Sequence, residues 1–242
     1  MDVVRLLESH RGRDKIVRLA TYACMLLSGN GTGKFHKRME ILVRELGGCR
    51  TVLRLFDDLP MLASNYMYGT GSKEKNILVR ACRLITNLAY QVFFPVEHVA
   101  WLNDKGVISG FVSAKWVVGS IALWAIALMA DIIRCIARIS SIKTELRELK
   151  KQQILASEER NELSEDSVTI KEQRRKLIEE LQETYLTLIQ DGGDFMNAIN
   201  WMPPGFLWAG YFSRSSSGIF GLISTTMMLI KAWPKKSNQK AA

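Results

Sequence analysis

Long uncharged helical stretches constrain this chain more than any other feature of its sequence. The fifteen residues from Trp116 to Ala130 carry no charge, and a helix of that length rises about 22 Å. The hydrocarbon core of a bilayer is about 30 Å thick. Extending the helix over 111–134, with Lys115 and Arg134 directing their charged ends toward the interfaces, gives it enough length to cross. The first membrane segment is therefore expected at 111–134.

A second membrane segment is expected near the end of the chain. Pro203 and Pro204 break any helix at that point, and an apolar stretch follows them over 212–233. Arg214 would then lie near an interface or against a partner, because a charge inside the hydrocarbon core is costly. Tryptophans flank both apolar stretches in the manner of interfacial anchors, namely Trp116, Trp201, Trp208 and Trp233.

The rest of the chain also has the periodicity of helices. Apolar residues recur at spacings of three and four, an alternating strand pattern is almost absent, and only 5 of the 242 residues are proline. These observations predict an all-α integral membrane protein. Its expected regions are N-terminal amphipathic helices over 1–110, a first membrane segment over 111–134, a charged helical hairpin over 135–200, and a second membrane segment with a basic tail over 201–242.

The stretch from Met39 to Met67 is predicted to be an amphipathic helix that Pro60 kinks or ends. Its apolar face falls within an arc of about 100° and comprises Leu42, Leu46, Cys49, Leu53, Phe56, Ala63 and Met67. Its polar face includes Arg44, Arg50 and Arg54, whose charge is offset by nearby Asp and Glu residues. Two interpretations remain open for this helix. It packs into a helical bundle, or it lies in the membrane interface and displaces lipid from one leaflet.

The next helix is predicted from Asn76 to Phe94, with Pro95 ending it. Further along, the chain becomes highly charged over 139–194, with a polar turn near its middle. The apolar residues that begin this region keep the 3-4-3 spacing of a coiled-coil seam, and they are Ile139, Ile142, Leu146 and Leu149. This pattern predicts either a helical hairpin or a self-association segment, and the sequence does not choose between them.

A net charge of +9 and an isoelectric point near 9.5 favour nucleic acid or an anionic membrane as partner. The basic residues stand among apolar stretches, and no zinc-finger or RNA-recognition signature accompanies them. A phospholipid membrane is therefore the expected partner, and nucleic acid is not.

The distribution of charge leaves the membrane orientation open. Residues 1–115 carry 17 Lys and Arg against 10 Asp and Glu, residues 131–194 carry 11 against 14, and the remainder carries 5 against none. These totals favour both ends in the cytosol and the middle on the other side. The basic residues directly after the first membrane segment favour a cytosolic middle instead, because charges close to a span weigh most in the positive-inside rule.

No motif in the chain predicts catalysis or a cofactor. A glycine-rich turn before Lys34 lacks both the earlier glycine and the following Ser or Thr that a phosphate-binding loop needs. The four cysteines and three histidines are too widely spaced to predict a metal site. Asp131 is the one carboxylate within a predicted span, and it either marks the end of that span or lines a pore.

Four segments stand out in order along the chain: GRDK at 12–15, RTVLRLFDDL at 50–59, FPVEHVAW at 94–101 and WMPPGFLWAG at 201–210. Together they resemble the peroxin-11 family of peroxisomal membrane proteins, and most closely its gamma branch. The resemblance covers nearly the whole chain and is weakest over 143–170.

This resemblance implies a multi-pass protein of the peroxisomal membrane that promotes membrane elongation, peroxisome proliferation and fission. It implies self-association, association with other family members, and action with fission adaptors and a dynamin-related GTPase. Both termini are expected in the cytosol. The family's lipid-remodelling amphipathic helix maps onto roughly Met39–Met67, although the near-neutral charge here departs from the strongly basic helix of some members.

Three hypotheses follow. The leading one is a membrane-elongation factor without enzymatic activity, in which the 39–67 helix acts as an interfacial wedge. The second is an oligomeric pore for small metabolites, with Asp131 or Arg214 facing its lumen. The third is a soluble helical scaffold whose apolar stretches form its core.

Overall fold

A computed structural model describes residues 2–74, 76–109, 113–158 and 165–233. All regular structure in these ranges is helical, which confirms the all-α prediction. The helices are α1 (Asp2–Glu8), α2 (His10–Ser28), α3 (Lys34–Arg54), α4 (Asp58–Tyr68), α5 (Ile77–Asp104), α6 (Ser113–Glu158), α7 (Glu165–Asn200) and α8 (Arg214–Ala232).

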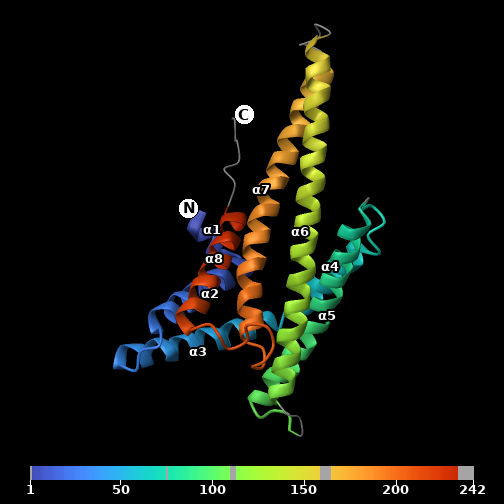
Figure 1. The fold of residues 1–242 in the computed structure, drawn as a ribbon. Coiled ribbons are helices and arrows are strands. Elements are labelled where there is room, and N and C mark those ends of the chain that lie inside the picture. Colours follow the sequence, from blue (N-terminus) through green and yellow to red (C-terminus); the bar gives the residue numbers. More distant parts are fainter. Residues whose placement is uncertain (1, 75, 110–112, 159–164, 234–242) are drawn as a thin grey trace.

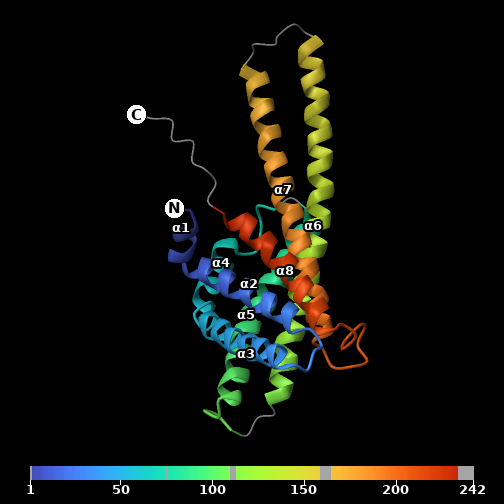
Figure 2. The same cartoon turned by 90° about the vertical axis from the view of Figure 1, so that its left-hand side faces the viewer.

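The two longest helices, α6 and α7, lie side by side as a hairpin that projects from the rest of the molecule (Figure 1). The first half of α6 packs against α5, and the second half of α7 packs against α8. A further group of helices, α2 and α3, packs beside α8, and α3 runs across the direction of α6 (Figure 1, Figure 2). Helices far apart in sequence therefore meet around the lower part of the hairpin.

Polar side chains set the starts of several helices. Ser9 accepts a hydrogen bond from the Gly12 amide at 3.0 Å and so caps α2. Asn76 accepts bonds from two amides of the first turn of α5, and Ser213 caps α8 in the same manner. Such caps satisfy amide groups that have no partner within the helix. Local sequence chemistry thus explains where these helices begin.

The prediction of one helix over 39–67 is wrong. The chain forms α3 up to Arg54 and α4 from Asp58, with a break at residues 55–57. The break precedes Pro60, which lies in the first turn of α4, where a missing amide hydrogen costs little. Pro60 therefore begins a helix here instead of ending one.

Pro95 does not end a helix either. It lies inside α5, which continues to Asp104. A proline in a helix removes one backbone hydrogen bond and costs about 3 kcal/mol, so tertiary contacts have to compensate. On either side of it, Phe94 is buried and Glu97 forms an ion pair with Arg54 of α3. These contacts hold the helix together past the proline.

Two helices of the described residues are long and apolar enough to cross a membrane: α5, and α6 over Ala114–Ile154. Residues 113–134 of the segment expected at 111–134 lie at the start of α6, and residues 111–112 lie outside the described ranges. The second expected segment, 212–233, corresponds to α8 and its flanking residues, and α8 is not one of the two candidates. Only 28% of the apolar window is buried in each, so most of both windows faces outward, unlike the core helix of a soluble scaffold.

Glycines allow α8 to approach its neighbours closely. A Cβ added to Gly221 would lie 2.1 Å from the ring of Tyr22 on α2. One added to Gly218 would meet the backbone of Leu26, and one added to Gly193 on α7 would meet the backbone of α8 at Phe220. Helix backbones that pass this closely exclude even an alanine side chain, so these positions fix the spacing of α2, α7 and α8.

We predict that Gly221→Ala lowers the stability of the protein by roughly 1–3 kcal/mol, because the added methyl group overlaps the buried Tyr22 ring. The matched control is Gly48→Ala on α3, where a Cβ meets nothing within 4 Å. Alanine is favoured over glycine inside a helix by about 0.5–1 kcal/mol, so the control should be neutral or stabilising. Thermal unfolding in detergent measures both, and equal melting temperatures for the two variants would contradict the packing described.

Candidate functional site

Exposed apolar side chains are frequent on α4 and α5, which pack against each other. On and just before α4, four of them are more than 70% exposed: Phe56 71%, Leu59 75%, Tyr66 89% and Met67 86%. On α5 they recur at helical spacing along one side, as Ile77, Leu78, Leu84, Ile85, Leu88 and Val92. We call these ten residues the α4–α5 apolar surface. Apolar surface of this extent marks contact with a membrane or another protein.

Polar contacts orient α4 on α5. Near the start of α4, Asp58 lies 3.2 Å from His98 Nδ1, and further along Asn65 donates a hydrogen bond to Gln91 at 2.8 Å. The earlier residue of α4 thus contacts the later residue of α5, so the two helices are antiparallel. Because the polar side of α4 faces α5, its apolar side faces outward. The residues from Leu59 to Ser72 include no charged side chain.

The predicted apolar face of 39–67 is divided by the fold. Phe56, Ala63 and Met67 are exposed, as are Leu42 and Cys49 on α3. Two others, Leu46 and Leu53, are half-buried and face the neighbouring helices. The outer side of α3 mixes apolar residues with charged ones. The outer side of α4, which carries no charged residue from Leu59 onward, is therefore more uniformly apolar than the outer side of α3.

The three arginines of the predicted polar face do not share one environment. Arg44 is exposed and lies 3.2 Å from Glu45. Arg50 turns inward and lies 3.1 Å from Asp14 of α2, and burial lowers the pKa of Arg50 below its usual value. Arg54 also turns inward and donates two hydrogen bonds to Glu97 of α5. Arg50 and Arg54 thus attach α3 to the bundle.

A buried ion pair joins α2 to α7. The side chains of Arg18 and Asp194 are 7% and 3% exposed. Arg18 also donates hydrogen bonds at 3.0 Å to Ser224 and Thr225 of α8. Burial on its own would lower the pKa of Arg18, but the carboxylate of Asp194 raises it above its usual value. Arg18 therefore links three helices, through Asp194 of α7 and two hydroxyl groups of α8.

The four tryptophans predicted as interfacial anchors have different surroundings. Trp116 is half-buried near the start of α6, and Trp233 is exposed at the end of α8. Trp201 stacks on Trp124 of α6, with ring centroids 6.0 Å apart. Trp208 donates a hydrogen bond to the carbonyl of Met196 at 3.0 Å. The last two help to fix the turn between α7 and α8, and an anchoring role stays a prediction for all four.

Asp131 and Arg214, the charged residues expected within spans, both have partners. Arg134, one turn further along α6, donates to both carboxylate oxygens of Asp131, at 2.6 and 3.0 Å. Arg214 pairs with Glu40 of α3 at the surface. A central cavity of about 510 Å³ lies between α2, α3, α5, α6 and α7, and neither residue lines it.

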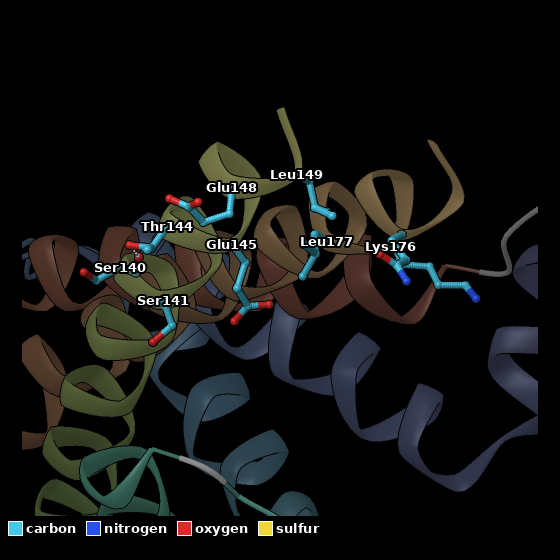
Figure 3. Close-up of a pocket in the computed structure, with 9 residues that line it drawn as sticks. Ser140, Ser141, Thr144, Glu145, Glu148, Leu149, Lys176 and Leu177 are labelled. Atoms are coloured by element: carbon cyan, nitrogen blue, oxygen red, sulfur yellow. Dashed lines mark hydrogen bonds between the residues drawn. The ribbon is translucent and has the colours of Figure 1, made fainter. Parts of the chain in front are cut away.

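The predicted coiled-coil seam faces the partner helix of the hairpin. Ile139 and Ile142 are buried, and Arg138 donates two hydrogen bonds to Glu180 of α7. Further out an open groove of about 780 Å³ lies along the two helices (Figure 3). Its lining combines hydroxyl, charged and apolar side chains, including Ser140, Ser141, Thr144, Glu148, Leu149 and Leu177. Of the two alternatives left open by the sequence, the structure therefore shows the hairpin.

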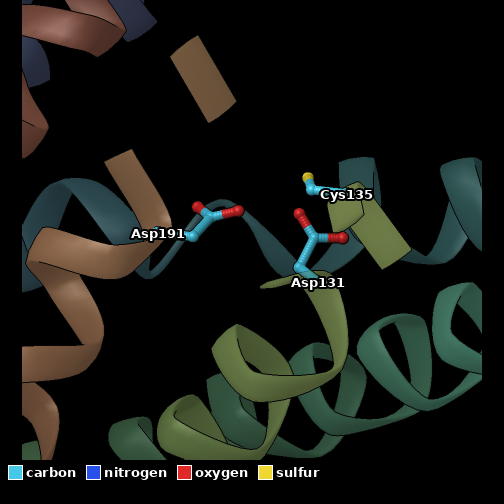
Figure 4. A group of neighbouring side chains, drawn as sticks. All are labelled: Asp131, Cys135 and Asp191. Atoms are coloured by element: carbon cyan, nitrogen blue, oxygen red, sulfur yellow. The ribbon is translucent and has the colours of Figure 1, made fainter. Parts of the chain in front are cut away.

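Sequence reasoning missed the buried carboxylates of α7. Asp191 and Asp194 stand in a highly charged region, and no local pattern distinguishes them from solvated residues. The paired glycines between them, which allow close helix contact at Gly193, are the one signal that the region is packed. Among the described residues, one group of side chains could hold a metal ion, and it consists of Asp131, Cys135 and Asp191 (Figure 4).

These features define a class of protein: an all-helical chain with two helices long and apolar enough to cross a membrane and a projecting charged hairpin. The family model for Peroxisomal biogenesis factor 11 (PEX11) matches residues 1–233. The chain belongs to this family, which acts in peroxisome proliferation and membrane remodelling.

Two curated relatives are similar over almost their full length. Peroxisomal membrane protein 11C from Homo sapiens is 33% identical over 232 residues, which cover 93% of this chain and 91% of the relative. The protein of the same name from Mus musculus has the same identity and coverage. No solved structure matches the chain. The resemblance seen in the four sequence segments is thus confirmed at the level of the family.

We predict that Asp194→Leu lowers stability by about 3–5 kcal/mol, because it leaves the guanidinium of Arg18 buried without its counter-ion. Arg18→Met combined with Asp194→Leu should recover most of this loss, since both charges are then absent. Chemical unfolding of the detergent-solubilised protein measures the difference. A double variant no more stable than Asp194→Leu alone would contradict the assignment of the loss to an unpaired charge.

Proposed function

We propose that this protein elongates the peroxisomal membrane by inserting the α4–α5 apolar surface into lipid, with α5 and α6 as its anchors, and that it does so without enzymatic activity. The exposed, uncharged side of α4 is the observation that carries the proposal. Full burial of a large apolar side chain contributes about 1.5–3 kcal/mol. Four such side chains on α4 therefore supply a substantial driving force without attraction to anionic lipid.

The α4 helix is too short to cross the membrane, so its insertion would affect one leaflet more than the other. Its 11 residues rise about 16 Å, roughly half of the 30 Å hydrocarbon core. The 28 residues of α5 rise about 42 Å and are long enough to cross it. A helix that reaches into one leaflet adds area to that leaflet alone, and a difference in area between leaflets favours curvature. In this proposal the wedge expected on 39–67 is narrowed to its second half.

The role proposed for α3 is to brace α4. Arg50 and Arg54 attach α3 to α2 and α5, and only residues 55–57 separate it from α4. A wedge held rigidly transmits the force of insertion to the rest of the protein, whereas a tethered one swings freely. The exposed Leu42 and Cys49 then lie near the headgroups.

Both termini are proposed to face the cytosol. If α5 and α6 cross the membrane, their connection lies on one side and both ends of the chain on the other. This arrangement is supported by the proximity of α1 to the end of α8 (Figure 1, Figure 2). The hairpin projects toward that same side and carries the basic residues that follow the apolar part of α6, which favours the cytosol. Partners proposed there are further copies of the chain, other family members, fission adaptors and a dynamin-related GTPase.

The pore alternative finds less support. It required Asp131 or Arg214 to face a lumen, but both are engaged in ion pairs and neither lines the central cavity. Membrane shaping is therefore the function that the geometry favours.

We predict that replacing Phe56, Leu59 and Met67 together with Ser abolishes peroxisome elongation while leaving targeting unchanged. All three side chains are largely exposed, so the fold should tolerate the change, but the apolar driving force for insertion is lost. The measurement is peroxisome length in cells that lack the native protein, with protein level and location recorded in parallel.

Two matched variants complete this experiment. Serine at Ile154 and Ile178, exposed apolar residues of the projecting hairpin, should leave elongation intact. Serine at Ile41, Leu42 and Val52 tests the outer side of α3 and should have a smaller effect than the α4 variant. Normal elongation by a correctly targeted α4 variant would sink the proposal, and a total loss with the α3 variant would move the wedge to α3.

The orientation is tested by protease access in intact organelles. Tags at both ends of the chain should be digested without membrane permeabilisation, because all three cytosolic parts lie on one side. A tag inserted near Lys105, in the connection between α5 and α6, should be digested only after permeabilisation. Protection of either terminal tag would contradict two crossings by α5 and α6.

A further inference from the structure

Two carboxylates and a thiol come together where the hairpin meets the rest of the bundle. Asp131 and Cys135 lie one turn apart on the same side of α6, and Asp191 reaches them from α7 (Figure 4). One ligand atom from each of the three lies within 4.8 Å of the other two. The group therefore joins α6 and α7 through residues that are up to sixty positions apart in sequence.

Within the part of the chain that the structure describes, Asp191 has a buried carboxylate oxygen without a hydrogen-bond partner, which points to a ligand there. Its side chain points toward Asp131 and Cys135 (Figure 4), and the residue is only 4% exposed. Gln190 donates a hydrogen bond to Oδ1 at 3.1 Å, but Oδ2 is buried and has no hydrogen-bond partner among the described residues. An unpartnered carboxylate oxygen in such a place costs several kcal/mol. The carboxylate of Asp191 also faces that of Asp131, and the two negative charges repel each other. Either a shared proton or a bound cation relieves this repulsion.

We propose that Asp131, Cys135 and Asp191 form a binding site for a thiophilic divalent cation, with Zn²⁺ as the ion that fits best. One sulfur and two oxygen donors suit zinc, which accepts thiolate and carboxylate ligands together. Magnesium and calcium prefer six or more oxygen donors. Three protein ligands leave a fourth tetrahedral position for water or another small donor.

The charges of the site balance for a divalent ion. Both carboxylates and the Cys135 thiolate supply three negative charges, and Arg134 supplies one positive charge beside Asp131. A Zn²⁺ ion neutralises the remaining two. Each carboxylate oxygen has two lone pairs, so Asp131 can bind the ion while it accepts the hydrogen bonds of Arg134. Binding releases the thiol proton of Cys135 to solvent.

An ion can reach the site from the central cavity, and once bound it would link two helices. Asp191 lies on the wall of the central cavity, from which an ion reaches the three ligands. Once bound, it ties α7 to α6 at the base of the hairpin. The bridge sets the direction in which the hairpin projects, and this consequence holds whether or not α4 is the membrane wedge.

The test uses the full-length protein in detergent, treated with a chelator and then given one equivalent of Zn²⁺ or Co²⁺. Wild-type protein should retain about one ion per chain after gel filtration, and Co²⁺ should give the thiolate-to-metal charge-transfer absorption. Its melting temperature should rise by about 5 °C or more when free Zn²⁺ is well above the dissociation constant. Cys135→Ser and Asp191→Asn should each weaken binding by about 100-fold or more, beyond the loss typical of outer-shell changes.

Cys24→Ser is the matched control, because this half-buried thiol lies on α2 away from the group. It should bind Zn²⁺ and shift in melting temperature as the wild type does. Absence of binding by a folded wild-type protein would overturn the proposal and leave a shared proton between the carboxylates. Equal binding by wild type, Cys135→Ser and Asp191→Asn would overturn it too, since the ion would then be held elsewhere.

Discussion

The buried ion pair between Arg18 and Asp194 determines how the two groups of helices meet. Burying two charges is favourable only when their remaining hydrogen-bonding groups are satisfied, and Ser224 and Thr225 of α8 satisfy those of Arg18. The pair therefore fixes α2, α7 and α8 as a unit. Two further inward-facing arginines, Arg50 and Arg54, attach α3 to that unit and to α5. With the polar contacts collected inside, the apolar residues of α4 and α5 are left outside.

The local features of this fold could be predicted from the sequence. The helical periodicity, the apolar start of α6 and the hairpin all depend on patterns within a few turns of chain, and each is present. The two prolines were misjudged for a different reason. Pro60 lies in the first turn of α4 and Pro95 lies within α5. The position in the helix and the tertiary contacts decide what a proline does, and neither is visible in periodicity.

The candidate site was predicted only in part, because an apolar helix face predicts burial without saying against what. Leu46 and Leu53 are half-buried, whereas Phe56 and Met67 are exposed. The arginines of the same stretch looked solvated, yet Arg50 and Arg54 find carboxylates on helices that are distant in sequence. The outer side of α5 went unrecognised as a candidate span since its helix was expected to stop at Pro95. Asp191 and Asp194 could not be distinguished from their charged neighbours without the fold.

The unequal lengths of the helices connect the fold to the proposed shaping of membrane. The 46 residues of α6 rise about 69 Å, more than twice the hydrocarbon thickness, so its charged half has to stand outside the bilayer. In the proposed arrangement its apolar half and α5 set the depth of the protein in the membrane. The α4 helix, which Asp58 and Asn65 hold against α5, is too short to match that depth. In this proposal a short apolar helix packed against a long one displaces lipid unequally between the leaflets. Many copies oriented in the same way would add their effects, and the projecting hairpins would bring the copies or their partners into contact above the surface that they bend.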